Sequence, residues 1–342
     1  MRSRIRLGIP DTLPTARKVG IACSLLIGMA SLPTAGQPAK SEHCARACLE
    51  GYVDRYVDAM VAHNVRDDLF ERDAKFTENG VRLPLGREGL WFRISGKGTY
   101  KFYVPDVETQ QVAFFGTVHE KERNENLTDG LVLRLKIVGD RITEVEQLVI
   151  RPEGGLASNG TRTERPSSTG ERVEKMGSPN PIFLEAIPEA KRPSREELIK
   201  TANYYFSGLQ RNDGKGYYPF TDDCDRYENG NHSTNVPMRN PVTGDTEVMS
   251  CKKQFEVALK NVVSRVRDRR FVAVDRERGI VFAFAFFDHE NINWTWQLGE
   301  LFKIEDGKIR RIEAIFHRAP YGISSGWSTY EQGMSDQPQS IR

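Results

Sequence analysis

Hydrophobic positions along the chain recur with helical spacing in two segments. In residues 44–64, apolar side chains recur three and four positions apart, which predicts a helix with one apolar face. Residues 194–197, Ser-Arg-Glu-Glu, form a capping-box signature and predict the start of a second helix, which runs to about Asn212. Each predicted helix is followed by segments with strand-like patterns.

The clearest strand pattern is Ile142–Ile150, in which apolar and polar side chains alternate as a half-buried antiparallel strand requires. In the first half, strands are predicted at residues 75–77, 100–104, 111–119, 131–137 and 142–150. In the second half, they are predicted at residues 226–228, 271–274, 280–288, 294–304 and 309–317. The pattern in each half therefore predicts a helix, a short strand and a four-stranded antiparallel meander.

The two halves are copies of one unit. Glu78-Asn79-Gly80 recurs 150 positions later as Glu228-Asn229-Gly230, and Leu135-Lys136-Ile137 recurs 167 positions later as Phe302-Lys303-Ile304. The offset changes in one place, so the second half carries an insertion of about 19 residues that ends in Cys251. The sequence predicts an α+β fold with two tandem domains, residues 41–152 and 194–331.

Two other segments lack these patterns. Residues 153–193 begin with a stretch rich in Gly, Ser, Thr and Pro, which predicts a flexible domain linker. Their later part, residues 181–188, is apolar enough to lie along a domain. The polar tail at residues 332–342 is predicted to be disordered.

Residues 1–36 read as an export signal. Basic residues precede the apolar run Val19–Leu32, and the small-residue stretch Pro33–Gly36 follows it. A membrane anchor is the alternative, but the run is shorter than the roughly 20 residues that span a bilayer. We expect a periplasmic or extracellular protein that has no membrane association once the signal is removed.

The formal charge of +2 depends on this N-terminal segment. Residues 1–18 contain five basic residues and one acid, so the chain without them has a charge near −2. The remaining Lys and Arg are interleaved with acids, whereas a nucleic-acid-binding protein would show a basic stripe. We therefore expect no nucleic-acid partner, and the sequence is compatible with an oligomer.

Export would allow the remaining cysteines to form disulfides. Cys224 and Cys251 flank the insertion, where a bridge would stabilise the fold by about 3 kcal/mol. Cys44 and Cys48 lie one helical turn apart, where a bridge requires strained geometry. The sequence leaves the pairing open, and it predicts no metal site because no Cys-x2-Cys pair has a matching His pair.

Three stretches carry a resemblance to a known family, namely Arg267–Phe271, Val274–Gly279 and Phe286–His289. With the order of elements, they make the chain resemble tandem secreted members of the nuclear-transport-factor-2-like superfamily. This superfamily includes ketosteroid isomerases, SnoaL-type polyketide cyclases and scytalone dehydratase. The resemblance covers most of both halves but not the signal, linker or tail. It implies that a curved sheet in each half wraps around a cone-like pocket closed by helices.

The resemblance also implies three site residues in the second half. Tyr205 takes the place of the tyrosine that donates a hydrogen bond to the oxyanion in ketosteroid isomerases. Glu228 takes the place of the base, where a pocket that is largely apolar would raise its pKa, and Glu300 takes the third polar position. Both acids are Glu where the family has Asp, which moves each carboxyl by about one bond.

In the first half, Tyr56 and Glu78 match the first two positions, but Leu133 occupies the third. We therefore expect the first half to be a degenerate, structural copy and the second half to hold the functional pocket. The alternative for Glu-Asn-Gly is a strand-ending turn in which Asn and Gly adopt left-handed backbone conformations.

Other polar candidates lie nearby in the sequence. Asp288 and His289 follow an apolar strand and could form an acid–base pair, although adjacent strand residues point to opposite faces and at most one reaches the pocket. Arg226 and His317 are candidate ligand-binding residues. A metal site would require His317 or His232 to converge with an acid, which the sequence does not favour.

Aromatic residues with a period of two suggest a wall for a flat apolar ligand. Trp294 and Trp296 share one face of their strand, and Phe284 and Phe286 share one face of theirs. The alternative is an ordinary hydrophobic core, which aromatic residues at this spacing form more often.

These residues support two hypotheses. The first is a cofactor-free lyase, isomerase or dehydratase that acts on a small apolar or aromatic carbonyl molecule, with Glu228 moving a proton and Tyr205 and Glu300 stabilising the oxyanion. The second is a non-catalytic exported module that binds an apolar ligand or another protein. No cofactor is predicted, because the chain has no Gly-rich phosphate loop and no dinucleotide-binding fingerprint.

Overall fold

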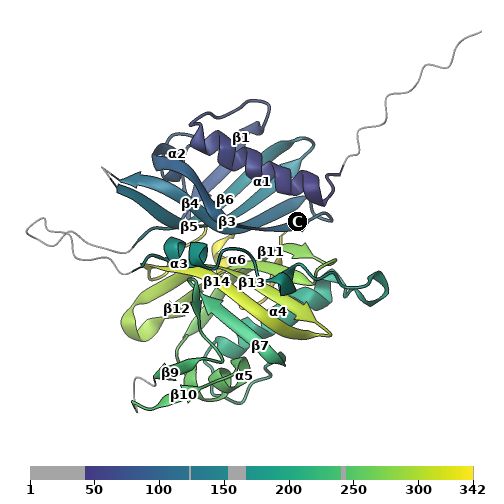
Figure 1. The fold of residues 1–342 in the computed structure, drawn as a ribbon, viewed down its shortest axis with the longest axis vertical. Helices are drawn as coiled ribbons and strands as arrows, with labels where there is room; N and C mark the ends of the chain where they lie inside the picture. The colour runs from purple at the N-terminus through teal and green to yellow at the C-terminus, as the bar shows by residue number, and fades with distance from the viewer. Residues whose placement is uncertain (1–42, 123–124, 153–166, 240–243, 342) are drawn as a thin grey trace, which may run out of the picture. The chain divides into compact units, whose positions relative to one another are not determined.

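Two β-sheets with the same strand order make up most of the computed structural model, which describes residues 43–122, 125–152, 167–239 and 244–341 (Figure 1). The first sheet has the order β2-β1-β6-β5-β4-β3. Its strands are β1 (Phe70–Glu78), β2 (Val81–Arg82), β3 (Ile94–Asp106), β4 (Gln111–Glu122), β5 (Glu125–Val138) and β6 (Arg141–Ile150).

The second sheet has the order β15-β11-β12-β13-β14-β7-β8, which repeats the first sheet and adds β15 at one edge. Its strands are β7 (Phe220–Glu228), β8 (Asn231–His232), β11 (Arg265–Asp275), β12 (Ile280–His289), β13 (Trp294–Glu305), β14 (Lys308–Pro320) and β15 (Gln339–Ser340). The predicted internal repeat is confirmed, because equivalent strands pair in the same order. The fold is α+β, with a strongly curled sheet, a second sheet and few helices.

A long helix packs on one face of each sheet. In the first half, α1 (Arg46–Val61) buries Tyr52, Tyr56 and Met60 in a core shared with the sheet. In the second half, α4 (Arg195–Leu209) places Tyr205 and Phe206 in the equivalent core. The capping box predicted at the start of α4 is present, since Ser194 and Glu197 bond to each other's backbone N–H groups.

A third hydrophobic core lies between the two sheets. It contains side chains of the first sheet, such as Phe102 and Phe115, and of the second, such as Phe282 and Phe284. Strand β12 is therefore buried on both faces, which explains why it is almost continuously apolar. An ion pair also connects the two sheets. Arg270 of β11 donates to both carboxylate oxygens of Glu146 of β6, at 2.6 and 2.7 Å.

Part of the predicted linker is ordered. Residues 153–166 lie outside the described residues, but α3 (Thr169–Lys175), η1 (Pro181–Phe183) and η2 (Glu189–Lys191) follow. Val173 and Phe183 are fully buried in the core between the sheets. The flexible-linker prediction is wrong for α3, where Val173 fills space between the sheets, whereas the buried Phe183 agrees with the prediction that residues 181–188 lie along a domain.

The insertion in the second half contains β9 (Pro237–Arg239) and β10 (Thr246–Val248) and ends in Cys251, where α5 (Cys251–Lys253) begins; the π-helical segment η3 (Gln254–Ala258) follows. The short helices α2 (Leu90–Arg93), η4 (Glu290–Ile292) and α6 (Tyr330–Met334) complete the described elements. The predicted export signal lies outside these residues, and the domain boundaries stay a prediction, since residues 41–342 form one compact unit.

The C-terminal segment that begins near Trp327 is ordered, and it includes described residues of the tail, 332–342, that was predicted to be disordered. The Trp327 indole N–H donates to Thr77 Oγ1 at 2.7 Å, and the ring lies under Lys75 and Arg134. Further on, β15 pairs with β11, and Gln111 donates to the carbonyl of Ile341 at 2.9 Å. The tail is held by this strand pairing, by hydrogen bonds of the Gln339 side chain and by the packing of Ile341 against the core between the sheets.

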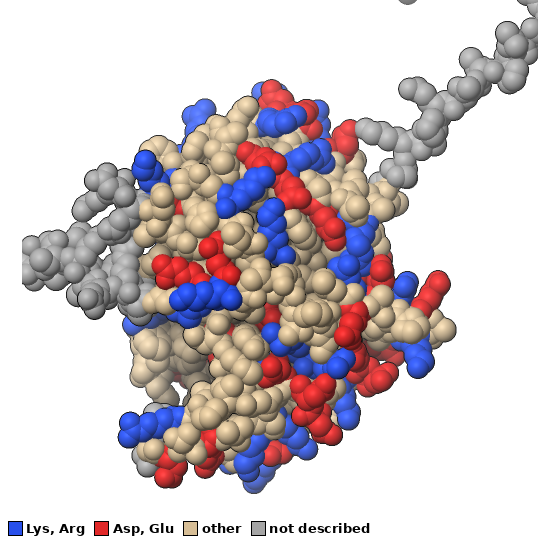
Figure 2. Space-filling model, viewed as in Figure 1, with Lys and Arg blue, Asp and Glu red and all other residues tan. Residues whose placement is uncertain are grey.

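Two disulfides are present, Cys44–Cys48 at the start of α1 and Cys224–Cys251 between β7 and α5. They settle the pairing that the sequence left open, and they are compatible with export. In the part of the chain that the structure describes, no helix is both long enough and apolar enough to cross a membrane. On the face seen in Figure 2, Lys and Arg side chains lie among Asp and Glu side chains.

Candidate acid–base site in the second half

The Glu-Asn-Gly motif ends β7 in a two-residue turn. Asn229 and Gly230 have φ angles of 50° and 76°, the left-handed region that this turn requires. The Asn229 side chain also ties the turn to β14, since Nδ2 donates to the Phe316 carbonyl and Oδ1 accepts from its N–H. Asn79 makes the same pair of bonds with Val149 in the first half. Asn and Gly are therefore architectural in both copies, as the alternative interpretation predicted.

Glu228 and Glu300 lie in one row across the second sheet. Glu228 of β7 is opposite Ala314 of β14, and Ala314 is opposite Glu300 of β13. Residues that face each other across a sheet share a face. Because Leu298 and Phe302 on either side of Glu300 belong to the core under α4, this row faces α4, which contributes Tyr205. The structure thus brings the three predicted residues together.

Glu300 is the carboxyl with the strongest perturbation in this group. It is 2% exposed, and its burial, followed by the charge of Glu228, raises its pKa to about 8 against the opposing effects of Arg226 and Tyr205. Its Oε2 atom is buried and has no hydrogen-bond partner among the described residues. At neutral pH, Glu300 is therefore protonated and can donate one hydrogen bond.

Tyr205 is also kept protonated. It is 2% exposed, and burial raises its pKa well above the usual value, helped by the nearby carboxyls of Glu300 and Glu228. The rings of Phe220, Phe255 and Phe302 pack around it, with centroids 6.3, 5.1 and 5.3 Å away. These rings exclude water, so the Tyr205 hydroxyl and the protonated Glu300 carboxyl lie in a medium of low dielectric constant.

Arg226 is the buried cation of the site. Its Nη2 donates to Gln254 Oε1 at 2.7 Å, and its Nε lies 3.5 Å from Glu228 Oε1. Ser233 Oγ donates to the other oxygen of Glu228 at 3.1 Å. The Glu228 side chain is 33% exposed, so this acid is the one that solvent reaches. The apolar surroundings expected for Glu228 are found around Glu300 instead.

The equivalent site in the first half is closed by internal bonds. Glu78 accepts from the Leu90 N–H and the Gln147 amide, each at 2.8 Å, and from Arg151 at 2.9 Å. The Tyr56 hydroxyl donates to Gln147 at 2.8 Å. Gln147 stands opposite Glu78 where Ala314 stands opposite Glu228. The longer side chain fills the first site, whereas the alanine leaves the two acids of the second site without such a bridge.

Asp288 and His289 point to opposite faces, as strand geometry predicts. Asp288 accepts from Arg267 Nε at 2.8 Å and from Thr295 Oγ1 at 2.7 Å, so it forms a buried ion pair away from Tyr205. His289 lies on the face of α4, where its ring centroid is 4.9 Å from that of Trp296. The two residues therefore do not form the acid–base pair that their adjacency suggested.

The predicted aromatic wall is divided between two faces. Trp296 packs against the core under α4, but Phe284 belongs to the core between the sheets and Phe286 lies under Arg267. His317 is also remote from Tyr205, because it contacts Gln297 and lies near Arg151 of the first half. Burial and Arg151 lower its pKa to about 4. Phe284, Phe286 and His317 are thus wrong as candidates for this site.

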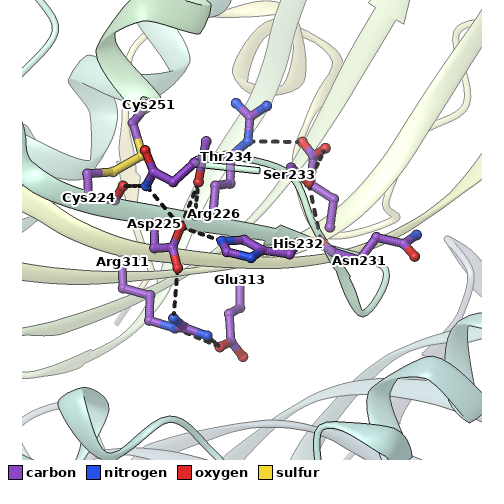
Figure 3. A network of polar contacts seen from close by, with 12 residues as sticks. Cys224, Asp225, Arg226, Asn231, His232, Ser233, Thr234, Cys251, Arg311 and Glu313 are labelled. Atoms are coloured by element: carbon purple, nitrogen blue, oxygen red, sulfur yellow. Dashed lines mark hydrogen bonds and ion pairs between the residues drawn. A yellow bond between two sulfur atoms is a disulfide. The ribbon is translucent and has the colours of Figure 1, made fainter. Parts of the chain in front are cut away.

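Figure 3 shows the contacts of Arg226 and Ser233 together with those of Asp225, whose side chain lies on the other face of β7. Asp225 accepts from His232 at 2.5 Å and from Thr234 at 2.9 Å, and Arg311 lies 3.7 Å away. His232 stacks on Tyr227, with centroids 4.4 Å apart. These bonds hold the β7–β8 turn and the nearby disulfide, and they leave Asp225 fully engaged.

Sequence reasoning missed Gln254 and Ser233, which hold Arg226 and Glu228 in place. Ser233 directly follows β8, in the place of Leu83 of the first half, and Gln254 lies just after Cys251, where the insertion ends. The change of offset between the two copies was the available signal, because an extra segment next to a motif is free to cover it.

Residues 191–316 match a family model described as a domain of unknown function (DUF8021). Among curated proteins, none matches this chain. A solved structure, the crystal structure of a de novo designed protein with curved beta-sheet, shows 18% identity and a TM-score of 0.25. That alignment covers 36% of this chain and 88% of the designed protein. Neither match assigns a function.

Proposed function

We propose that the second half is a cofactor-free enzyme of the isomerase, lyase or dehydratase type, acting on a small apolar or aromatic molecule that bears a carbonyl. The observation that carries the proposal is the buried Glu300, whose pKa of about 8 keeps it protonated beside Tyr205. Two such donors suit the negative charge that develops on a carbonyl oxygen when a neighbouring carbon loses a proton.

In this proposal, Glu228 removes a proton from the carbon next to the carbonyl. The electron pair moves onto the carbonyl oxygen, which accepts hydrogen bonds from Tyr205 and Glu300. In a β,γ-unsaturated ketone, Glu228 then returns the proton to the γ carbon, the carbon–carbon double bond shifts toward the carbonyl and the carbonyl forms again, so the overall reaction is an isomerisation. Arg226 keeps the Glu228 carboxylate oriented through their 3.5 Å contact. The order of elements in each half supports the further proposal that the fold is nuclear-transport-factor-2-like.

Proton abstraction can be tested without knowing the natural substrate. Hydrogen–deuterium exchange next to the carbonyl of a panel of small cyclic and aryl ketones is followed by NMR in D2O. We expect the protein to accelerate exchange and Glu228→Gln to lower the rate at least ~10²-fold, as loss of a general base does. Tyr205→Phe should lower it by about 10²-fold or more. Exchange at the uncatalysed rate with every ketone would refute the proposal.

A ligand-binding module without catalysis is the second candidate. The packing of phenylalanine rings around Tyr205 favours it, because a filled core leaves a substrate less room to reach the hydroxyl. This candidate predicts that native mass spectrometry of the purified protein finds a retained small molecule, while ketone exchange stays at the background rate.

A further inference from the structure

A cluster of aromatic and basic side chains lies at the β12–β13 hairpin, at one end of the face that bears Glu300. This hairpin cluster consists of His289, Trp294, Trp296, Phe316 and Arg318. Two of its nitrogen atoms, Nε2 of His289 and Nε1 of Trp294, are buried and have no hydrogen-bond partner within the described part of the chain. Buried polar atoms without partners are rare, and each calls for an explanation, such as a bound water or ligand.

The bonding of His289 decides what its free nitrogen can do. Its Nδ1 lies 2.8 Å from the carbonyl oxygen of Val262, so Nδ1 carries the hydrogen and donates it. The ring is 6% exposed, and this burial lowers its pKa, which keeps it neutral. Nε2 is therefore an acceptor, while the indole N–H of Trp294 is a donor. A hydroxyl group can bond to both, since it donates and accepts.

The rest of the cluster suits a flat ring. Trp296 stacks on Phe316 with centroids 4.6 Å apart and an interplanar angle of 18°. The Arg318 guanidinium lies 3.9 Å above the Trp294 ring. Along β13, Trp296 and Glu300 share a face and are four residues apart, a span on the order of 13 Å. A ring held here would thus lie on the same side of the sheet as the acids.

The first half has a different arrangement at the same place. There, Glu120 of β4 and Asp129 of β5 stand where the second half has His289 and Trp296. Glu120 forms ion pairs with Arg93 at 2.5 Å and Arg151 at 2.8 Å. An aromatic ring in place of Glu120 would leave Arg93 and Arg151 without this partner. The aromatic cluster is therefore particular to the second half.

We propose that the hairpin cluster binds a hydroxylated aromatic ring of the substrate, with its hydroxyl donating to Nε2 of His289 and accepting from Nε1 of Trp294. The inference rests on the proposed function in assigning the ring to a substrate. Its binding assay needs no turnover, and the ketone exchange assay needs no aromatic hydroxyl, so the two can fail separately.

The probes are 2-naphthol and 2-methoxynaphthalene, which share the ring but differ in the ability to donate a hydrogen bond. Isothermal titration calorimetry with the unmodified protein should give about tenfold tighter binding of 2-naphthol, the worth of one buried hydrogen bond. His289→Phe keeps an aromatic ring and removes the acceptor, so the two probes should bind to it equally. Trp294→Phe removes a donor that the oxygen of either probe can accept from, so it should weaken the binding of both probes and leave the preference unchanged.

His63 provides a matched control, because its Nδ1 also bonds to a backbone carbonyl, that of Trp91 at 2.7 Å. His63→Phe should leave the tenfold preference unchanged. Circular dichroism of each variant checks that it is folded. Equal binding of both probes to the unmodified protein would overturn the inference, since water would then satisfy the two nitrogens. A preference that survives in His289→Phe, or the absence of binding by either probe, would overturn it as well.

Discussion

Replacing Glu300 by Gln should remove a loss of stability that the wild type undergoes as the pH rises. Gln has nearly the shape of a protonated Glu and cannot ionise. In the folded protein, burial and Glu228 raise the pKa of Glu300 from 4.5 to about 8, whereas in the unfolded chain the group has its ordinary pKa. Between these two values, the unfolded chain releases a proton that the folded protein keeps. The wild type therefore loses stability as the pH rises through this window, and the loss levels off above about pH 8.

The size of the effect follows from the gap between the two pKa values. A gap of about 3.5 pH units corresponds to about 5 kcal/mol of unfolding free energy, which is an upper estimate for a buried group next to other charges. Urea unfolding followed by circular dichroism at several pH values from 4.5 to 8.5 measures it. The free-energy difference between Glu300→Gln and wild type should be small at pH 4.5 and reach several kcal/mol at pH 8.5. A difference that does not change with pH would refute the reasoning.

Three further predictions concern stability. Asp129→Asn should remove another loss of stability toward high pH, because burial and Glu120 raise the pKa of Asp129 to about 8; pH-dependent urea unfolding would show this, and a slope equal to that of the wild type would contradict it. The Cys224→Ser, Cys251→Ser double variant should lose about 3.5 kcal/mol, since the bridge closes a loop with a sequence separation of 27; unchanged urea unfolding would count against this estimate. Arg270→Met should cost about 3–5 kcal/mol because it leaves Glu146 buried without its main partner, and a loss below about 1 kcal/mol would be inconsistent with that pairing.

Local signals in the sequence predicted the elements that depend on local chemistry. The capping box placed the start of α4 correctly, and Asn229-Gly230 forms the left-handed turn that its residues favour. The internal repeat predicted the common strand order of the two sheets. The pairing of Tyr205 with Glu228 came from the resemblance to ketosteroid isomerases, and not from the repeat.

The errors come from packing between segments that are distant in sequence. Phe284 and Trp296 each lie in a strand with aromatic residues at every second position. The packing of one sheet on the other decides which of these positions lie on the side of α4. Val173 is an isolated apolar residue in a polar stretch that was predicted to be flexible, yet it fills a gap that exists only once both sheets have formed. The perturbed acid was expected at Glu228 and is found at Glu300, since depth of burial depends on the whole sheet.

The most direct test of the proposed acid–base site compares two equivalent glutamates by ketone exchange in D2O. Glu228→Gln and Glu78→Gln change the same position of the repeat, but Glu78 is held by three internal hydrogen bonds whereas Glu228 is 33% exposed. We predict that Glu228→Gln lowers the exchange rate at least ~10²-fold and that folded Glu78→Gln protein keeps the wild-type rate. Equal rates in the two variants would contradict the assignment of the reaction to the second half.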